Sequence, residues 1–248
     1  MLRAIFLASA ATVALLPIAG FAAPLACPAG ARPPLALTFD DGPGKNTKYI
    51  LSELSRVGAN ATFFLVGKNA VSMPKQMSAI LNQGSEIGVH TWSHADLGKL
   101  SVDQADREVS KGYHAIVDRV PATVNWWRPP YGAQPHAGFT AGSDLGMRLA
   151  MWTLDSLDWQ NPSPQALLSF ITRSARPGDV VLVHEQSRAT LQALPALLDD
   201  LSSRFDLVTL DGLHAHPCMP SRYPRAMNRP TGKSTGSGGS AKKAVSSP

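Results

Sequence analysis

The chain has 248 residues, 44% of them hydrophobic, with 20 glycines and 20 prolines, which suits one globular domain with a sizeable core and many turns. Beyond the N-terminal segment no run of roughly 18 apolar residues occurs, which argues against a membrane-spanning helix in the body of the chain. The formal net charge is +5, but seven of the 23 basic residues lie in 1–23 and 219–248, which contain no acid, so the remainder has 16 basic against 18 acidic residues.

Residues 1–23 have the features of a secretory signal peptide. Arg3 is followed by an apolar stretch, then by Pro17 and by small residues. This order is typical of a cleaved leader, and we expect cleavage after Ala22 or Ala23. A retained membrane anchor is the alternative. The expected location is therefore secreted or periplasmic, and a chain sent there is not expected to have a nucleic-acid partner.

The two ends of the chain carry the only cysteines. Cys27 precedes the predicted domain, which we place at 30–216, and Cys218 follows it. In an oxidising compartment the two thiols can form a disulfide that joins the ends of the domain. Two unpaired thiols, or a lipidated Cys27, are the alternatives. Residues 219–248 are basic and rich in Gly, Ser and Lys, so we expect a disordered tail that can contact an anionic wall polymer or membrane surface.

Short apolar runs alternate with amphipathic stretches along the body of the chain. The apolar runs predict strands at 35–39, 61–66, 86–90, 124–128, 149–154, 179–184 and 207–210. Three- and four-residue spacing predicts helices at 47–57, 73–81, 101–120, 165–174 and 191–201, with a short helix within 137–145. Strands alternating with helices imply parallel strands and right-handed crossovers. The pattern leaves an irregular barrel and an open doubly wound sheet as alternatives, and no GxGxxG follows the first strand to support a dinucleotide.

Nearly every unusual polar residue falls at or just after the C-terminal end of a predicted strand. In α/β barrels and open α/β sheets this edge is where sites are built. The residues are Asp40, Asp41, His90, Arg128, Asp155, Asp158 and His184. Five strands that deliver such side chains to one edge predict a functional site there.

The stretch HTWSH, residues 90–94, supplies two imidazoles four residues apart. They can bind one metal ion if Asp40 or Asp41 is the third ligand, and such a site leaves a position open for water and substrate. Two His and one Asp suit zinc, although cobalt, nickel, manganese or iron can compete. The second aspartate then stays free to take a proton from the attacking water, and His184 is suited to protonate the leaving group.

Five segments resemble, in order, the motifs of the polysaccharide deacetylases, carbohydrate esterase family four. They are TFDDGP, HTWSH, RPPYG, DSLDW and VVLVH, and the similarity spans about residues 35–212. The resemblance implies a distorted (β/α) barrel with about seven parallel strands. It also implies metal-dependent removal of N-acetyl groups from N-acetylhexosamine polymers.

The resemblance implies a role for each site residue in this chain. Asp40 matches the general base, His184 the general acid, Arg128 the residue that orients the base, and Asp158 the partner of His184, although Asp155 stays an alternative for that partner. Asp41, His90 and His94 match the metal ligands. The backbone N–H of Tyr131 matches an oxyanion donor, and Trp159 and Leu182 match walls of the acetyl pocket.

We therefore predict a deacetylase of N-acetylglucosamine-containing glycans, such as peptidoglycan, chitin oligomers or an exopolysaccharide. The expected cofactor is Zn²⁺, with Co²⁺, Ni²⁺ or Mn²⁺ as alternatives. An O-acetyl esterase of xylan-like glycans would use the same water attack. A non-catalytic glycan- or wall-binding protein is a third interpretation, which the intact metal and acid–base positions disfavour.

Overall fold

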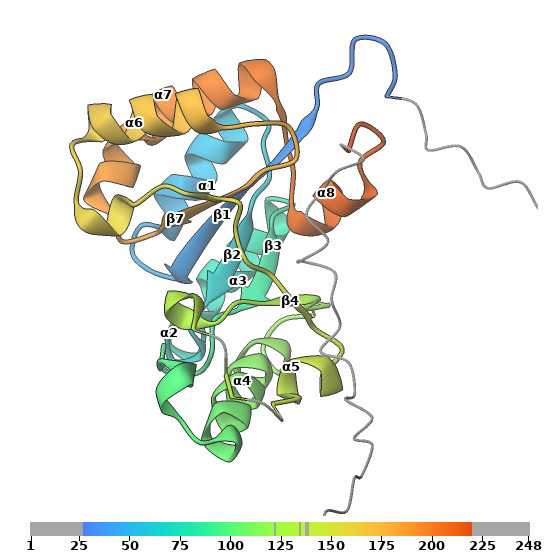
Figure 1. The fold of residues 1–248 in the computed structure, drawn as a ribbon, viewed down its shortest axis with the longest axis vertical. Coiled ribbons are helices and arrows are strands. Elements are labelled where there is room, and N and C mark those ends of the chain that lie inside the picture. Colours follow the sequence, from blue (N-terminus) through green and yellow to red (C-terminus); the bar gives the residue numbers. More distant parts are fainter. Residues whose placement is uncertain (1–26, 122, 134, 137–138, 220–248) are drawn as a thin grey trace, which may run out of the picture.

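A computed structural model describes residues 27–121, 123–133, 135–136 and 139–219 (Figure 1). The predicted leader and almost all of the predicted tail lie outside the described residues. The strands are β1 (Pro34–Gly42), β2 (Thr62–Leu65), β3 (Glu86–Val89), β4 (Trp126–Trp127), β5 (Arg148–Leu149), β6 (Leu154–Asp155), β7 (Val180–His184) and β8 (Asp206–Leu207). The α-helices are α1 (Thr47–Arg56), α2 (Gly67–Ser72), α3 (Pro74–Asn82), α4 (Val102–Val117), α5 (Ala141–Asp144), α6 (Pro164–Ser174), α7 (Arg188–Arg204) and α8 (Leu210–Ala215).

The strands form one parallel sheet that curls into an incomplete barrel. Its order is β5-β4-β3-β2-β1-β7-β6, and β8 adds a short pairing at the beginning of β1. Within the described residues no pairing joins β5 to β6, so the barrel stays open on that side. The predicted fold, a distorted (β/α) barrel with about seven parallel strands, is confirmed.

The central strand β1 shows how one sequence serves both faces of the sheet. Leu35, Leu37 and Phe39 belong to the main core, together with the apolar faces of the helices. Ala36 belongs to a second, smaller cluster with Phe64 of β2, Trp126 of β4, Ala150, and Val180 of β7. Because side chains alternate along a strand, this second cluster marks the inner face of the curled sheet, and Thr38 and Asp40 point the same way.

Helices α1 to α7 cover the outer face of the sheet, with α6 and α7 side by side next to β7 and β1 (Figure 1). Helix α8 instead adds Leu210 and Leu213 to the second cluster on the inner face. The apolar stripes of α6 and α7 were visible in the sequence, and so was the start of α4, where Ser101 and Gln104 form a reciprocal capping box. Two short helices were not predicted. α2 has six residues and α8 has six, and neither is long enough to show a helical repeat.

The predicted strand at 149–154 is wrong, because this segment forms two strands at opposite edges of the sheet. β5 pairs with β4, whereas β6 pairs with β7. Between them the carbonyls of Ala150 and Met151 accept hydrogen bonds from the buried guanidinium of Arg128, at 3.0 and 3.2 Å. These carbonyls are therefore used by a side chain rather than by a neighbouring strand, and the segment crosses the open side of the barrel.

The predicted strand at 207–210 is also too long. Pairing with β1 stops at Leu207, and Thr209 then caps α8, its hydroxyl accepting the backbone N–H of Gly212 at 3.0 Å. A threonine with an extended backbone before a helix supplies this cap. The apolar residue Leu210 is buried as the first residue of α8, not as the end of a strand.

The ends of the described domain are joined covalently. Cys27 and Cys218 form a disulfide, with their Cα atoms 4.4 Å apart across 191 residues of sequence. Neither is therefore a free thiol in this structure. None of the helices in the described part of the chain has the length and apolar content to cross a bilayer.

Candidate active site

The strand ends bring nine of the ten predicted site residues to one cleft of about 560 Å³. The tenth, Arg128, lies behind the cleft wall and is fully buried. The cleft opens at the C-terminal edge of the sheet, where sites of parallel α/β folds lie. The nine lining residues are Asp40, Asp41, His90, His94, Tyr131, Asp158, Trp159, Leu182 and His184.

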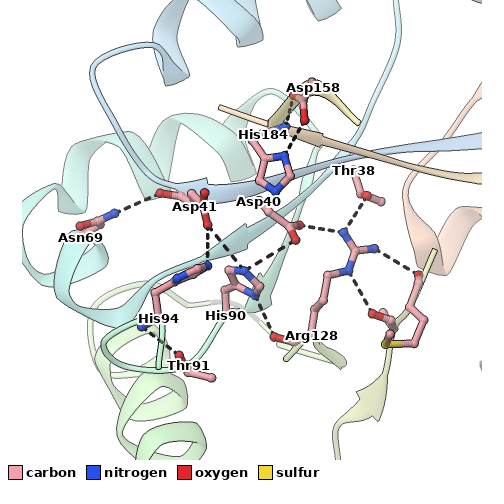
Figure 2. A network of polar contacts seen from close by, with 12 residues as sticks. Thr38, Asp40, Asp41, Asn69, His90, Thr91, His94, Arg128, Asp158 and His184 are labelled. Atoms are coloured by element: carbon pink, nitrogen blue, oxygen red, sulfur yellow. Dashed lines mark hydrogen bonds and ion pairs between the residues drawn. The ribbon is translucent and has the colours of Figure 1, made fainter. Parts of the chain in front are cut away.

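Asp41, His90 and His94 converge on one point in the cleft (Figure 2). An oxygen of Asp41 lies 3.1 Å from Nε2 of His94 and 3.6 Å from Nε2 of His90. One ligand atom from each of the three residues lies within 4.8 Å of the other two. Two imidazoles and a carboxylate, with further positions open to the cleft, are the donor set of catalytic zinc sites.

The chemical state of these side chains fits a cation. Nδ1 of His90 is 2.8 Å from the carbonyl of Arg128 and donates its hydrogen there, so the Nε2 lone pair faces Asp41 and His94. Burial lowers the pKa of His90 more than the neighbouring aspartates raise it, which favours the neutral imidazole. The buried Oδ1 of Asp41 accepts no backbone or hydroxyl hydrogen within the described protein, and the polar atoms beside it are the Nε2 atoms of His94 and His90. A buried carboxylate oxygen beside two imidazole nitrogens is suited to a bound cation, and these three residues can hold one.

Electrostatics favour the ionised form of Asp41. Burial by itself raises the pKa of this carboxyl, but the imidazole of His94, followed by His90 and His184, outweighs it, and the pKa is lowered. Its carboxylate is thus available as a ligand over the neutral pH range.

Asp40 has a different environment from its neighbour Asp41. It is almost fully buried, and one carboxylate oxygen accepts Nη1 of Arg128 at 2.7 Å. The same Nη1 donates to the hydroxyl of Thr38 at 2.9 Å, and the guanidinium packs 4.0 Å from the centroid of Phe64. The second oxygen of Asp40 lies 3.6 Å from Nε2 of His90. Arg128 therefore fixes the carboxylate of Asp40, whose other oxygen faces the metal-ligand cluster.

His184 ends β7 and pairs with the fully buried Asp158. Nδ1 of His184 lies 2.6 Å from one carboxylate oxygen of Asp158, and the other oxygen accepts the His184 backbone N–H at 2.9 Å and the Thr190 hydroxyl at 2.5 Å. Burial lowers the pKa of His184, but the bond and charge of Asp158, with Asp40 and Asp41, outweigh it and raise the pKa to about 9. The imidazole is therefore protonated at neutral pH, as a general acid must be.

The structure distinguishes between the two candidate partners of His184. Asp158 makes the contact, whereas the carboxylate of Asp155 accepts the backbone N–H of Leu157 at 2.9 Å, in a local turn. Asp155 still lies on the cleft wall.

The three predicted pocket residues sit at different depths in the cleft. Leu182 is 3% exposed, whereas Trp159 is 58% and Tyr131 is 71% exposed. The Tyr131 ring meets His94 edge to face, with centroids 4.9 Å apart. Leu182 thus lies in the wall and the two aromatic rings lie at the rim.

Sequence reasoning missed several residues that support this site. Thr38 contacts Arg128, Thr190 contacts Asp158, and Asn69 donates to the backbone carbonyl of Asp41 at 3.0 Å. Only Thr38 had a signal, because it lies two residues before Asp40 and strand alternation puts both on one face. Thr190 and Asn69 lie on helices, α7 and α2, as ordinary polar residues.

Glu185, the residue after His184, does not line the cleft. Its side chain is fully buried behind the segment that follows β1 and accepts the Thr47 hydroxyl at 2.7 Å. Burial raises the pKa of Glu185 to about 7. A Cβ on Gly42 would lie 2.0 Å from this carboxyl, so glycine is required where the two meet.

Comparison with known proteins agrees with this geometry. The polysaccharide deacetylase family model matches residues 29–150. A chitooligosaccharide deacetylase of Sinorhizobium fredii is 33% identical over 155 residues, which cover 62% of this chain and 72% of that protein. The solved structure of T48 deacetylase with substrate is 36% identical, has a TM-score of 0.68, and is matched over 74% of this chain and 92% of that one.

A longer relative is matched only in part. The peptidoglycan-N-acetylglucosamine deacetylase PgdA of Listeria monocytogenes is 30% identical over 182 residues. The match covers 73% of this chain but 38% of that protein.

Proposed function

Because the chain belongs to the polysaccharide deacetylase family, we propose that it is a metal-dependent hydrolase that removes acetyl groups from N-acetylglucosamine residues of a glycan and releases acetate. One observation carries the proposal. The three residues suited to a metal ion, a carboxylate suited to act as base and a protonated imidazole line the same cleft. These are the parts that hydrolysis of an acetamide needs.

Asp41, His90 and His94 would hold the cation. A divalent ion, with Zn²⁺ first among the candidates and Co²⁺, Ni²⁺ and Mn²⁺ as alternatives, would supply Lewis-acid polarisation of the acetyl carbonyl and a lowered pKa for water.

The chain's own residues then divide the proton transfers. Asp40, held by Arg128, takes the proton from the attacking water. The backbone N–H of Tyr131 donates to the oxygen of the tetrahedral intermediate. His184, kept protonated by Asp158, gives its proton to the departing nitrogen, so that the amine leaves as the C–N bond breaks.

The amide reaction is favoured over ester hydrolysis by the His184–Asp158 pair. An amine is a poor leaving group unless it is protonated, whereas an alcohol leaves with less assistance. The short contact and the raised pKa of His184 supply the acid that the amide requires. The named relatives act on peptidoglycan and chitooligosaccharides, and we extend that substrate class, including exopolysaccharides, to this chain.

The test measures acetate released from N-acetylglucosamine oligomers, from peptidoglycan and from acetylated xylan, with metal content determined on the same sample. We expect release from the first two, one divalent ion per chain, and loss of both in His90→Ala. His114→Ala is the matched control, because this histidine is half exposed on α4, away from the cleft. Release from xylan alone would favour the esterase, and binding to wall material without release or metal would favour the non-catalytic alternative.

We also propose export to the periplasm or the outside of the cell, supported by the leader-like residues 1–23. The basic tail can then contact an anionic wall or membrane surface. N-terminal sequencing of the mature protein tests export: a start directly after Ala22 or Ala23 is expected, and a retained Met1 would contradict cleavage.

A further inference from the structure

The loop after β3 has a strained backbone at His94. Thr91 and His94 both have left-handed backbone angles, with φ of 63° and 62°. A non-glycine residue in this region is strained and persists only where its surroundings fix it. The place of the His94 imidazole beside Asp41 therefore depends on contacts that hold the loop.

Glu108 of α4 makes two of these contacts through Ser93, the residue directly before His94. One oxygen of its carboxylate accepts the Ser93 backbone N–H at 2.8 Å, and the other accepts the Ser93 hydroxyl at 2.9 Å. Hydrogen bonds to an ionised acceptor are roughly twice as strong as neutral ones, and a paired contact fixes orientation as well as distance. Glu108 lies outside the five motifs, yet it holds the neighbour of a candidate metal ligand.

The other side of the same loop rests on the first turn of α2. The backbone N–H groups of Gly67 and Lys68 donate to the carbonyls of Thr91 and Trp92, at 2.9 and 3.0 Å. A Cβ on Gly67 would lie 2.8 Å from the Trp92 ring, so glycine is needed for this close approach. The loop is thus held between α2 and α4.

The same turn of α2 also reaches the segment that carries Asp41. Nδ2 of Asn69 donates to the backbone carbonyl of Asp41 at 3.0 Å, and Figure 2 shows the amide pointing at that carbonyl. Asp41 has a φ of 72°, so its backbone is strained in the same way as that of His94.

We propose that Glu108 and Asn69 are positioning residues for a divalent cation, Glu108 fixing His94 through Ser93 and Asn69 fixing Asp41 through its backbone carbonyl. The inference rests on the proposed function, because it requires that the cation binds to Asp41, His90 and His94. The third ligand, His90, is oriented differently, by the carbonyl of Arg128.

The test measures Zn²⁺ affinity of the metal-free full chain by competition with a chromophoric chelator, and the visible absorption of the Co²⁺-loaded protein. Glu108→Ala is expected to weaken Zn²⁺ binding about tenfold or more, the range for residues that orient metal ligands, and to alter the Co²⁺ bands. Glu108→Gln keeps one acceptor and should recover part of the affinity. Asp103→Ala removes an exposed carboxylate from the same helix and should bind as the wild type does.

The melting temperature of each metal-free protein separates a local role from a general one. Glu108→Ala protein that melts lower but keeps wild-type affinity and Co²⁺ spectrum would overturn the role of Glu108. If that variant does not fold, Ser93→Ala removes the hydroxyl contact alone and is judged by the same two readouts. Wild-type protein that binds no Zn²⁺ would overturn the proposed function itself, whereas unchanged binding in the variants would overturn only this inference.

Asn69→Ala tests the second positioning residue in the same assays. A loss of Zn²⁺ affinity is expected, with Asn82→Ala, an exposed amide at the end of α3, as the control. Because the two residues act on different ligands of one cation, the double variant should lose more affinity than either single variant, and the departure from a simple product measures their coupling. Wild-type affinity and an unchanged Co²⁺ spectrum in Asn69→Ala would overturn the role of Asn69.

Discussion

Strand β3 has a titratable side chain near each end of its inner face, partly buried at one end and fully buried at the other, and the two are used differently. Glu86 begins the strand at the N-terminal edge of the sheet, and His90 follows its last residue at the C-terminal edge. His90 is a neutral imidazole whose Nε2 faces other ligands and the cleft. Glu86 is enclosed, and its carboxylate accepts the Thr62 hydroxyl at 2.8 Å and the backbone N–H of Leu210 at 3.1 Å.

At the N-terminal edge, Glu86 belongs to a cluster of polar side chains centred on Asp211. Burial, then the charge of Asp211, raises the pKa of Glu86 to about 8, so the protonated Glu86 can donate to Asp211. Asp211 also accepts Nδ2 of Asn125 at 2.5 Å and Nε1 of Trp126 at 3.0 Å, and forms an ion pair with Arg148. At the C-terminal edge the buried Oδ1 of Asp41 instead faces the imidazole nitrogens of His90 and His94. The polar side chains of the N-terminal edge thus bind one another and stabilise the fold, whereas those of the C-terminal edge are available to bind a ligand.

Backbone strain follows the same division. Where helices turn back into strands at the N-terminal edge, the left-handed residues are Gly58, Gly84, Gly146 and Gly178, for which this conformation costs little. Around the cleft, six residues with side chains adopt it: Asp41, Thr91, His94, Tyr131, Leu157 and Asn161. Backbone strain of this kind is retained where a side chain is needed at that position, and such residues cluster at functional sites.

The largest effect should come from Asp40→Asn at the C-terminal edge. The amide cannot accept the proton from water, so we expect kcat/KM to fall by about 10²–10⁴-fold. Zn²⁺ content should stay near the wild-type value, because the three ligands are unchanged. Asp211→Asn, the matched substitution at the N-terminal edge, should retain activity. Near-normal turnover in Asp40→Asn would remove this residue from the role of base.

Asp158→Asn should produce the next largest effect, and its sign depends on pH. His184 must be protonated to donate, so activity falls as pH rises through its pKa of about 9. Without the carboxylate that raises it, this pKa falls, and the alkaline limb of the kcat profile moves to lower pH. We expect about a 10²-fold loss at pH 8 and a smaller loss at pH 6. An unshifted alkaline limb would show that another group supplies the proton.

Some parts of the fold and of the candidate site could be predicted from the sequence, and others depend on contacts between distant residues. Apolar runs and the polar residues at their ends are local features, so β1, β3 and β7 could be placed in advance, and with them Asp40, Asp41, His90, Asp158 and His184. The spacing in HTWSH added His94, whereas Tyr131, Trp159 and Leu182 were predicted only from the resemblance of their motifs to a known family. The crossing at Ala150 and Met151 could not, because its hydrogen bonds come from Arg128, a contact made only in the fold. The positioning residues Asn69 and Glu108 are ordinary polar helix residues, and nothing local marks the loops that they hold.

Removing the disulfide should affect stability and leave the chemistry almost unchanged. Cys27→Ser with Cys218→Ser opens a covalent loop of 191 residues at the side of the fold away from the cleft. Loss of a native disulfide typically costs 2–5 kcal/mol, chiefly because the unfolded chain gains freedom. We expect a lower melting temperature with kcat retained at 25 °C. A clear loss of kcat at a temperature where the variant is fully folded would contradict the prediction that the disulfide serves stability and not the cleft.

The smallest effect should come from Glu86→Gln, and it should be stabilising above neutral pH. The folded state holds the Glu86 proton more tightly than the unfolded chain does, since the pKa rises from about 4.5 to about 8. The free energy of unfolding therefore declines as pH rises between those values, where only the folded state binds the proton. Glutamine keeps an acceptor for Thr62 and the backbone N–H of Leu210 and a donor for Asp211, but carries no proton to lose. We expect near-equal melting temperatures at pH 5 and a higher melting temperature for Glu86→Gln than for the wild type at pH 9. If the melting temperatures of the wild type and Glu86→Gln change equally with pH, the pKa of Glu86 is not raised by folding. The contrast drawn between the two ends of β3 would then be wrong for Glu86.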